Sequence, residues 1–209
     1  MNLPERVEAL LDFWFGPPGD PAREQHRQIW FRSTPAFDMA LRGAFLADYE
    51  AAAAGGLTDW EASAEGALAL VLLLDQLPRN IFRETPRAYM TDAQARAVAD
   101  RALGRGFDRM VPPAWRLFLY MPFHHSEDLA DQRRSVALSA TLEPRDPDSR
   151  SSRRRYGRPY IEVIERFGRF PHRNAILGRQ STAEEIEFLK EATAGPRSVE
   201  SGPSARNRK

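Results

Sequence analysis

The sequence contains no cysteine, which excludes disulfide bonds, thiolate catalysis and zinc sites built on cysteine. Lysine is almost as rare, because all but two of the 30 basic residues are arginine, the exceptions being Lys190 and Lys209. The arginines supply many planar, permanently charged groups that suit carboxylates and phosphates. The formal net charge is only +1, so no overall field favours nucleic acid or an anionic membrane.

Long apolar runs and targeting segments are also lacking. The longest apolar run, Ala67 to Leu74, is far shorter than the stretch of about 20 residues that spans a bilayer. The first residues lack the basic and apolar regions of a secretory signal. We therefore expect a cytoplasmic protein that binds neither a membrane nor nucleic acid.

No segment alternates apolar and polar residues as a half-buried strand does. Apolar residues recur instead at helical spacing, as at Val7, Leu10 and Trp14. The stretch from about Ser63 to Leu77 is apolar on all sides in its middle, which predicts a buried central helix. We predict an all-α fold with no sheet, an array of antiparallel helical hairpins with about eight helices.

Helix ends are marked by proline and by polar side chains that can accept hydrogen bonds from the first turn. Ser126 predicts an N-cap, and Pro122 predicts a helix break. Two residue pairs predict capping boxes: Thr91 with Gln94, and Thr182 with Glu185.

The length of 209 residues fits a single domain. We expect one helical domain over residues 1–194, with a disordered loop at 143–155 and a disordered basic tail at 195–209. Both segments are rich in charge, serine and proline and have little apolar surface to bury.

Three segments carry groups suited to binding or catalysis. The first follows the apolar run, so Asp75 begins on a buried face, where a lone carboxylate is costly. Arg79 and Arg83 lie one and two turns further on and can neutralise it, and Asn80 lies between them. The segment is either part of a ligand site or a helix end with a structural ion pair.

The second segment lies where one helix ends and another begins. It contains two histidines, His124 and His125, and Glu127. Backbone N–H groups at a helix start can hold an anion, and histidine can carry a proton. The alternative is local capping, with each histidine hydrogen-bonded to a carbonyl.

The third segment is a non-periodic stretch dense in hydrogen-bond donors. It either binds a ligand or ties off the backbone of a helix–helix linker. Its polar residues are Arg169, His172, Arg173, Asn174 and Arg179.

We predict that the three segments converge on one concave site, because groups such as Asp75 are costly to bury unless they pair with one another. Arg79, Arg169 and Arg173 would then hold an anion, and Asp75 would position an arginine. Asn80, Arg83, Asn174 and Arg179 complete the expected ligand-binding set.

Catalysis at this site would use His125 or His172 to transfer a proton, with Glu127 orienting the histidine. The same residues and Asp75 could ligate a metal, but none has the spacing of a known metal signature. Phosphate-binding glycine loops, dinucleotide fingerprints and serine-nucleophile motifs are absent. We therefore expect no metal and no cofactor.

Several stretches of the chain resemble the bacterial domain-of-unknown-function 924 family. Together with the intervening helices they cover roughly residues 5 to 190. The resemblance implies a tetratricopeptide-like helical fold and no established activity. The matching stretches are Leu11 to Gly16, Leu73 to Arg83, Leu119 to Phe123, His125 to Gln132, and Phe167 to Asn174 with Leu177 to Arg179.

Three positions depart from what the resemblance implies. His124 stands where glutamate is expected, Tyr160 where histidine is expected, and Glu84 where glycine is expected. If these positions belong to the site, its chemistry is altered in this member.

Two function classes stay open. One is an enzyme or sensor whose polar Arg/His/Glu site binds a small anionic metabolite, and the other is an interaction module whose groove binds a peptide or partner protein. An enclosed polar site favours the first, and an exposed apolar groove favours the second.

Overall fold

The structure is a computed structural model that describes residues 3–142 and 158–194. These residues form helices and no strand, which confirms the all-α class with about eight helices. The loop expected at 143–155 and the tail expected at 195–209 lie outside the described residues. Within the described part of the chain, no helix is long and apolar enough to cross a membrane.

The elements follow one another with short connections. The α-helices are α1 (Leu3–Phe15), α2 (Pro35–Ala53), α3 (Ala64–Val71), α4 (Leu77–Ile81), α5 (Asp92–Gly104), α6 (Pro113–His124), α7 (Leu129–Ala140), α9 (Arg158–Phe167) and α10 (Ala183–Ala194). A π-helical turn, η4 (Leu72–Gln76), joins α3 to α4 without a break. The 3₁₀ turns are η1 (Pro21–Glu24), η2 (Gln28–Trp30), η3 (Thr58–Ala62), η5 (Pro86–Ala88), η6 (Phe107–Met110) and η8 (Pro171–Arg173).

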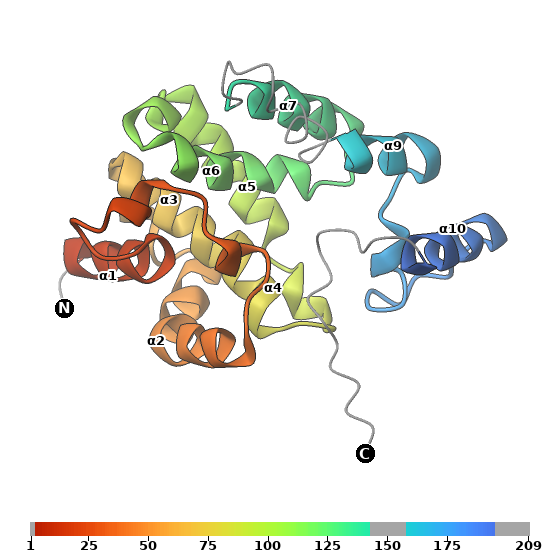
Figure 1. The fold of residues 1–209 in the computed structure, drawn as a ribbon, viewed down its shortest axis with the longest axis horizontal. Coiled ribbons are helices and arrows are strands. Elements are labelled where there is room, and N and C mark those ends of the chain that lie inside the picture. Colours follow the sequence, from red (N-terminus) through yellow and green to blue (C-terminus); the bar gives the residue numbers. More distant parts are fainter. Residues whose placement is uncertain (1–2, 143–157, 195–209) are drawn as a thin grey trace.

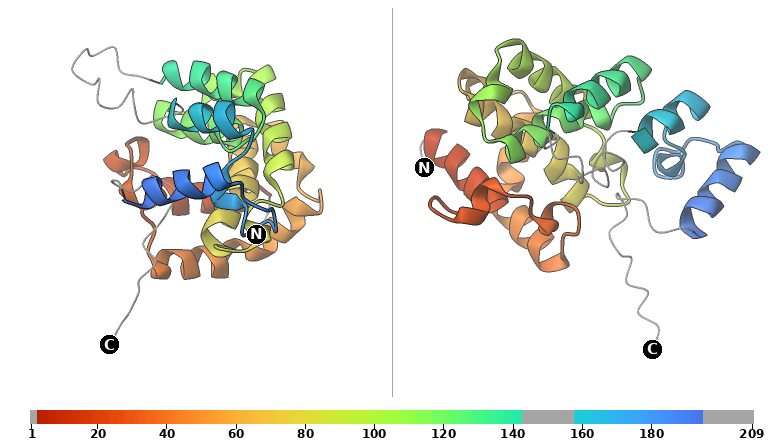
Figure 2. Two further views of the ribbon diagram at one scale, coloured as in Figure 1. Left: turned by 90° about the vertical axis from the view of Figure 1, so that its right-hand side faces the viewer. Right: turned by 45° about the horizontal axis from the view of Figure 1, so that its top comes forward.

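The continuous helix formed by α3, η4 and α4 is the centre of the fold. It packs against α1 and α2 on one side and against α5 and α6 on the other. Beyond these, α6 packs on α7 and α7 on α9, while α10 packs on η8 at the edge of the molecule (Figures 1 and 2). This succession of neighbours fits the expected helical array, and the tetratricopeptide-like relationship stays a prediction.

Aromatic rings fix α1 and η2 against α6. Phe15 stacks on Trp115 with 4.2 Å between ring centroids, and Trp14 meets Phe118 edge to face at 5.6 Å. Phe118 also contacts Trp30 of η2. Because each buried aromatic ring removes a large apolar area from water, this cluster is a main source of stability for the N-terminal half.

Helix α4 contains a proline in its first turn, and a contact with another part of the chain replaces the hydrogen bond that the proline cannot make. Pro78 has no N–H to give to the carbonyl of Leu74, and the hydroxyl of Thr91 donates to that carbonyl instead (2.6 Å). Thr91 therefore makes no capping bond, and Gln94 donates to the carbonyl of Ala53. The capping box predicted for Thr91 and Gln94 is wrong, because both side chains have partners on other helices.

Two other helix ends also differ from prediction, and one agrees. Helix α6 continues through Pro122, since a proline so near a helix end interrupts only one hydrogen bond. The N-cap of α7 is Asp128, whose carboxylate accepts from the first turn, while Ser126 accepts from the N–H of Asp128. The capping box of Thr182 and Glu185 is confirmed, with N–H to side-chain distances of 2.7 and 3.2 Å.

Glu84 is the one non-glycine residue of the described chain with a positive φ, which is 60°. It lies in the turn after α4. A side chain in this left-handed region clashes with its own backbone, whereas glycine does not. The glycine that the resemblance implies at this position is therefore the residue that the turn geometry favours.

Candidate functional site

The π-helical turn η4 places Asp75 in the interior with no exposed surface. Its carboxylate accepts hydrogen bonds from Nδ1 of His125 (2.8 Å) and Nε2 of Gln76 (2.6 Å), and it lies 3.2 Å from Nη1 of Arg79. The pairing of Asp75 with an arginine agrees with the sequence analysis. Asp75 also pairs with His125, which lies directly after α6.

These partners keep Asp75 charged. Burial raises the pKa of the carboxyl group, but the charges of His125 and Arg79 and the hydrogen bonds from His125 and Gln76 outweigh it, and the pKa falls to about 2. Because the carboxylate is charged and only an N–H can donate to it, the contact favours a proton on Nδ1 of His125. A carboxylate–histidine pair of this geometry is suited to general acid–base chemistry.

Asp92, at the start of α5, is a site residue that the sequence analysis missed. It binds both terminal nitrogens of Arg79, at 2.8 and 2.9 Å, and lies 3.6 Å from Nη1 of Arg173. The sequence signal read at this point was a capping box, and nothing local connects Asp92 to an arginine on another helix.

Arg173, in η8, is the most enclosed arginine of the site and is 4% exposed. Its Nη1 donates to the carbonyl of His125 (3.0 Å), and its guanidinium carbon lies over the rings of Tyr89 (4.7 Å) and Phe170 (4.5 Å). Its Nε and Nη2 are buried and have no hydrogen-bond partner among the described residues. Two donors of a buried cation are therefore unsatisfied.

We call Asp75, Arg79, Asp92, His125 and Arg173 the polar cluster. They come from η4, α4, α5, the turn after α6 and η8, so residues of all three sequence segments meet in it. The described residues contain no group of three or more side chains that could hold a metal ion.

Glu127 has a different role from the one expected. Its carboxylate binds Arg179 with both oxygens (2.6 and 2.9 Å) and accepts from the N–H of Phe170 (2.8 Å). Burial raises the pKa of Glu127, but these hydrogen bonds and the charges of Arg179 and Arg173 lower it overall. Asp75, rather than Glu127, holds His125, and Glu127 ties the loop before η8 to the start of α7.

Arg169 and Asn174 bind α10 rather than the polar cluster. Arg169 makes two hydrogen bonds to Glu185 (2.6 and 2.8 Å), and Asn174 donates to the same carboxylate (3.2 Å) and to Ser181 (3.1 Å). Glu185 therefore caps its own helix and anchors η8, and Arg169 already has its anion within the chain.

The end of α4 is fixed to α2 in the same way. Asn80 donates to Asp38 (2.8 Å), and Arg83 donates to Asp38 (3.2 Å) and to Ser33. These two predicted ligand-binding residues thus join helices. His172 is exposed beside Phe170, with 5.5 Å between ring centroids, while its neighbour Arg173 points inward.

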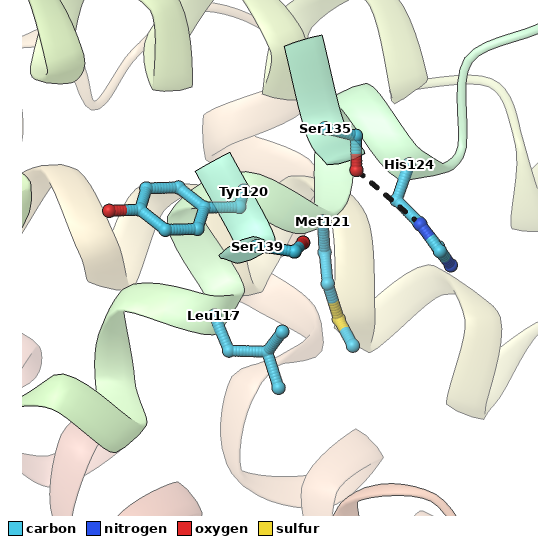
Figure 3. A pocket seen from close by; sticks show the side chains of 6 residues that line it. All are labelled: Leu117, Tyr120, Met121, His124, Ser135 and Ser139. Carbon is cyan, nitrogen blue, oxygen red and sulfur yellow. Dashed lines mark hydrogen bonds between the residues drawn. The ribbon is translucent and has the colours of Figure 1, made fainter. Parts of the chain in front are cut away.

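Two of the three departures lie together beside the polar cluster. The rings of His124 and Tyr160 are 4.0 Å apart, and His124 lies 5.9 Å from the ring of His125. Nδ1 of His124 is 3.4 Å from the hydroxyl of Ser135, in a small hollow lined by α6 and α7 (Figure 3). The two residues that depart from what the resemblance implies therefore lie in one contact rather than in two separate places.

The fold and cluster define an all-helical protein with a buried carboxylate–histidine–arginine centre. The chain belongs to the family of bacterial proteins of unknown function designated DUF924, whose family model matches residues 10–193. It is similar to the solved structure of a protein of unknown function, ATU0120 from Agrobacterium tumefaciens, with 39% identity, a TM-score of 0.79, and coverage of 91% of this chain and 99% of that one. No curated protein matches the chain.

Proposed function

We propose that this chain binds a small anion, of the carboxylate or phosphate type, at Arg173. The observation that carries the proposal is the pair of buried N–H donors, Nε and Nη2, that have no partner among the described residues. A buried unsatisfied donor costs about 1–3 kcal/mol, and more when the group is charged. An anion that accepts from both nitrogens removes this cost through a bidentate, charge-assisted contact.

Charge balance favours Arg173 over the other arginines. Arg79, Arg169 and Arg179 each bind a carboxylate of the chain with two hydrogen bonds. Among the carboxylates of the described residues, Arg173 reaches only Asp92, at 3.6 Å, and that carboxylate is already bound to Arg79. We therefore place the anion at Arg173 and regard the other three as residues that shape the site.

The burial of the cluster favours a small ligand over a peptide. Asp75, His125 and Arg173 are between 0% and 6% exposed, whereas a peptide groove requires accessible surface. If the bound anion reacts, His125 is the residue that exchanges a proton with it, and Asp75 stabilises the protonated histidine.

The test is a thermal-shift titration with acetate and with inorganic phosphate at constant ionic strength. A ligand at 100 times its dissociation constant adds about 2.7 kcal/mol, which for a domain of this size raises Tm by several degrees. We expect the wild type and Arg109→Met, which changes an exposed arginine, to respond alike. Arg173→Met should show no shift, and an undiminished shift in that variant would overturn the proposal.

A further inference from the structure

A cavity of about 250 Å³, open to solvent on one side, is lined by η3, α3, η4, α5 and the end of α2, apart from the polar cluster. Leu57, Leu70, Leu74 and Val98 form its apolar wall. None of the five residues of the polar cluster lines it. An apolar wall with a few polar groups at its rim is typical of a small-molecule site.

The polar groups of the cavity are neutral taken together. Glu61 and Arg101 bind each other through two hydrogen bonds of 2.7 Å, so each charge is already balanced. Thr58 contributes a hydroxyl group. Gln94 donates from Nε2 to the carbonyl of Ala53 (2.9 Å), and its amide oxygen remains as an acceptor. A charged ligand would have to compete with the Glu61–Arg101 pair, whereas a neutral one needs only the hydroxyl and the amide.

We infer that this cavity binds a small neutral molecule with an aromatic or aliphatic body and one hydroxyl or amide group. The volume bounds the part of the ligand that the cavity covers: a closed apolar cavity of about 150 Å³ accepts benzene, so an open cavity of about 250 Å³ covers roughly one ring with a short side chain. The apolar body lies against Leu70, Leu74 and Val98, and the polar group meets Thr58 or Gln94. This inference does not depend on the anion site at Arg173.

The probe is 2-phenylethanol, titrated into the ¹⁵N-labelled full chain and followed by the movement of amide resonances. Saturable shifts are expected at Leu57, Leu70 and Val98, which line the cavity. Shifts confined to other parts of the chain, or no saturable shift, would overturn the inference. Phenylacetate, similar in size but negatively charged, should produce no shift at these three cavity residues at the same concentration, whatever it does near Arg173. Equal or tighter binding of phenylacetate at the cavity would overturn the neutral class.

A larger side chain at the rim of the cavity tests the site, and the same replacement on another exposed helix face is its matched control. Ala97 lines the cavity but is exposed, so Ala97→Phe places a ring in the ligand's space at little cost to folding. It should abolish the phenylethanol shifts. Ala40→Phe, on the exposed face of α2, should keep them. Ala97→Leu is the smaller replacement should the ring disturb folding, and retained binding in a folded Ala97 variant would contradict the inference.

Discussion

At the residue scale, the polar cluster shows how a carboxylate is kept charged in the interior. Asp75 has no exposed surface, yet its pKa falls to about 2, because Arg79 and His125 offset the cost of burial. The same residue therefore stabilises the fold and fixes the proton of His125. A change at Asp75 should affect both stability and any chemistry at the site.

The protein should lose stability at acidic pH as Asp75 becomes protonated. The folded-state pKa of Asp75 lies below its ordinary value of 3.8, at about 2. Its contribution to the free energy of unfolding is therefore complete above about pH 5 and is lost as the pH falls toward 2. We expect the free energy of unfolding to lose about 2 kcal/mol from this group over that window. Urea titrations at a series of pH values measure the loss.

The control for the acid effect is Asp75→Asn. It should be destabilised by about 3 kcal/mol at neutral pH, because His125 loses its buried anion and Arg79 keeps only Asp92. Its free energy of unfolding should also change less than that of the wild type as the pH falls from 4. Equal pH dependence in the two proteins would show that Asp75 is not a source of the acid sensitivity.

A second residue-scale prediction is that Glu84→Gly stabilises the protein. The left-handed backbone at Glu84, with φ of 60°, costs a residue with a side chain about 1–2 kcal/mol, and glycine avoids this cost. Glycine also loses more conformational entropy on folding, which cancels part of the gain. We expect a gain of about 0.5–1 kcal/mol in urea denaturation. Glu165→Gly, in the exposed face of α9, should lose about 1 kcal/mol. A loss at both positions would rule out strain at Glu84.

At the scale of elements, the turn that positions Asp75 depends on a contact with the residue before α5. Pro78 leaves the carbonyl of Leu74 without a helical donor, and the Thr91 hydroxyl supplies one. Thr91→Val should cost about 1–3 kcal/mol, because the carbonyl is then buried without a partner. Equilibrium denaturation measures the loss directly.

The proline origin of this cost can be separated from loss of packing. In a Pro78→Ala background, the restored N–H can donate to the helix, so Thr91→Val should cost less than it does in the wild type. A double-mutant cycle with Pro78 and Thr91 measures this coupling. Additive effects would mean that the Thr91 hydroxyl acts independently of the missing N–H.

At the scale of the whole molecule, periodicity and burial could be read from the sequence, and long-range partners could not. The helical period predicted the all-α class, and the cost of burying Asp75 predicted its arginine partner. The capping box predicted at Thr91 is wrong, because the Thr91 hydroxyl donates to the carbonyl of Leu74 in η4 and does not cap its own helix. Local patterns contain no information on such tertiary competition.

The lack of tertiary information in local patterns also explains which parts of the site could not be predicted. The three polar segments meet, but the sequence could not assign partners among several arginines and carboxylates of similar chemistry. Glu127 was expected to orient a histidine and instead binds Arg179, which lies 52 residues away along the chain. Asp92, which binds Arg79, had no local signal of its own. Pairing among like residues is decided by the packing of helices.

The last prediction asks whether Arg173 serves the fold or a ligand. Methionine has a similar length and no donors, so Arg173→Met removes the two unsatisfied nitrogens, Nε and Nη2, and one hydrogen bond to the carbonyl of His125. Asp92 keeps both bonds to Arg79, so no carboxylate is left unpaired. Replacing a buried ionic group by a well-packed apolar one is often neutral or stabilising by about 1–4 kcal/mol. We therefore expect Arg173→Met, in urea denaturation without added anion, to be at least as stable as the wild type, as is common when a binding group is kept at a cost to stability. A loss of about 3 kcal/mol or more would instead mark Arg173 as a structural residue, since that is the penalty for breaking a buried pair on which the fold depends.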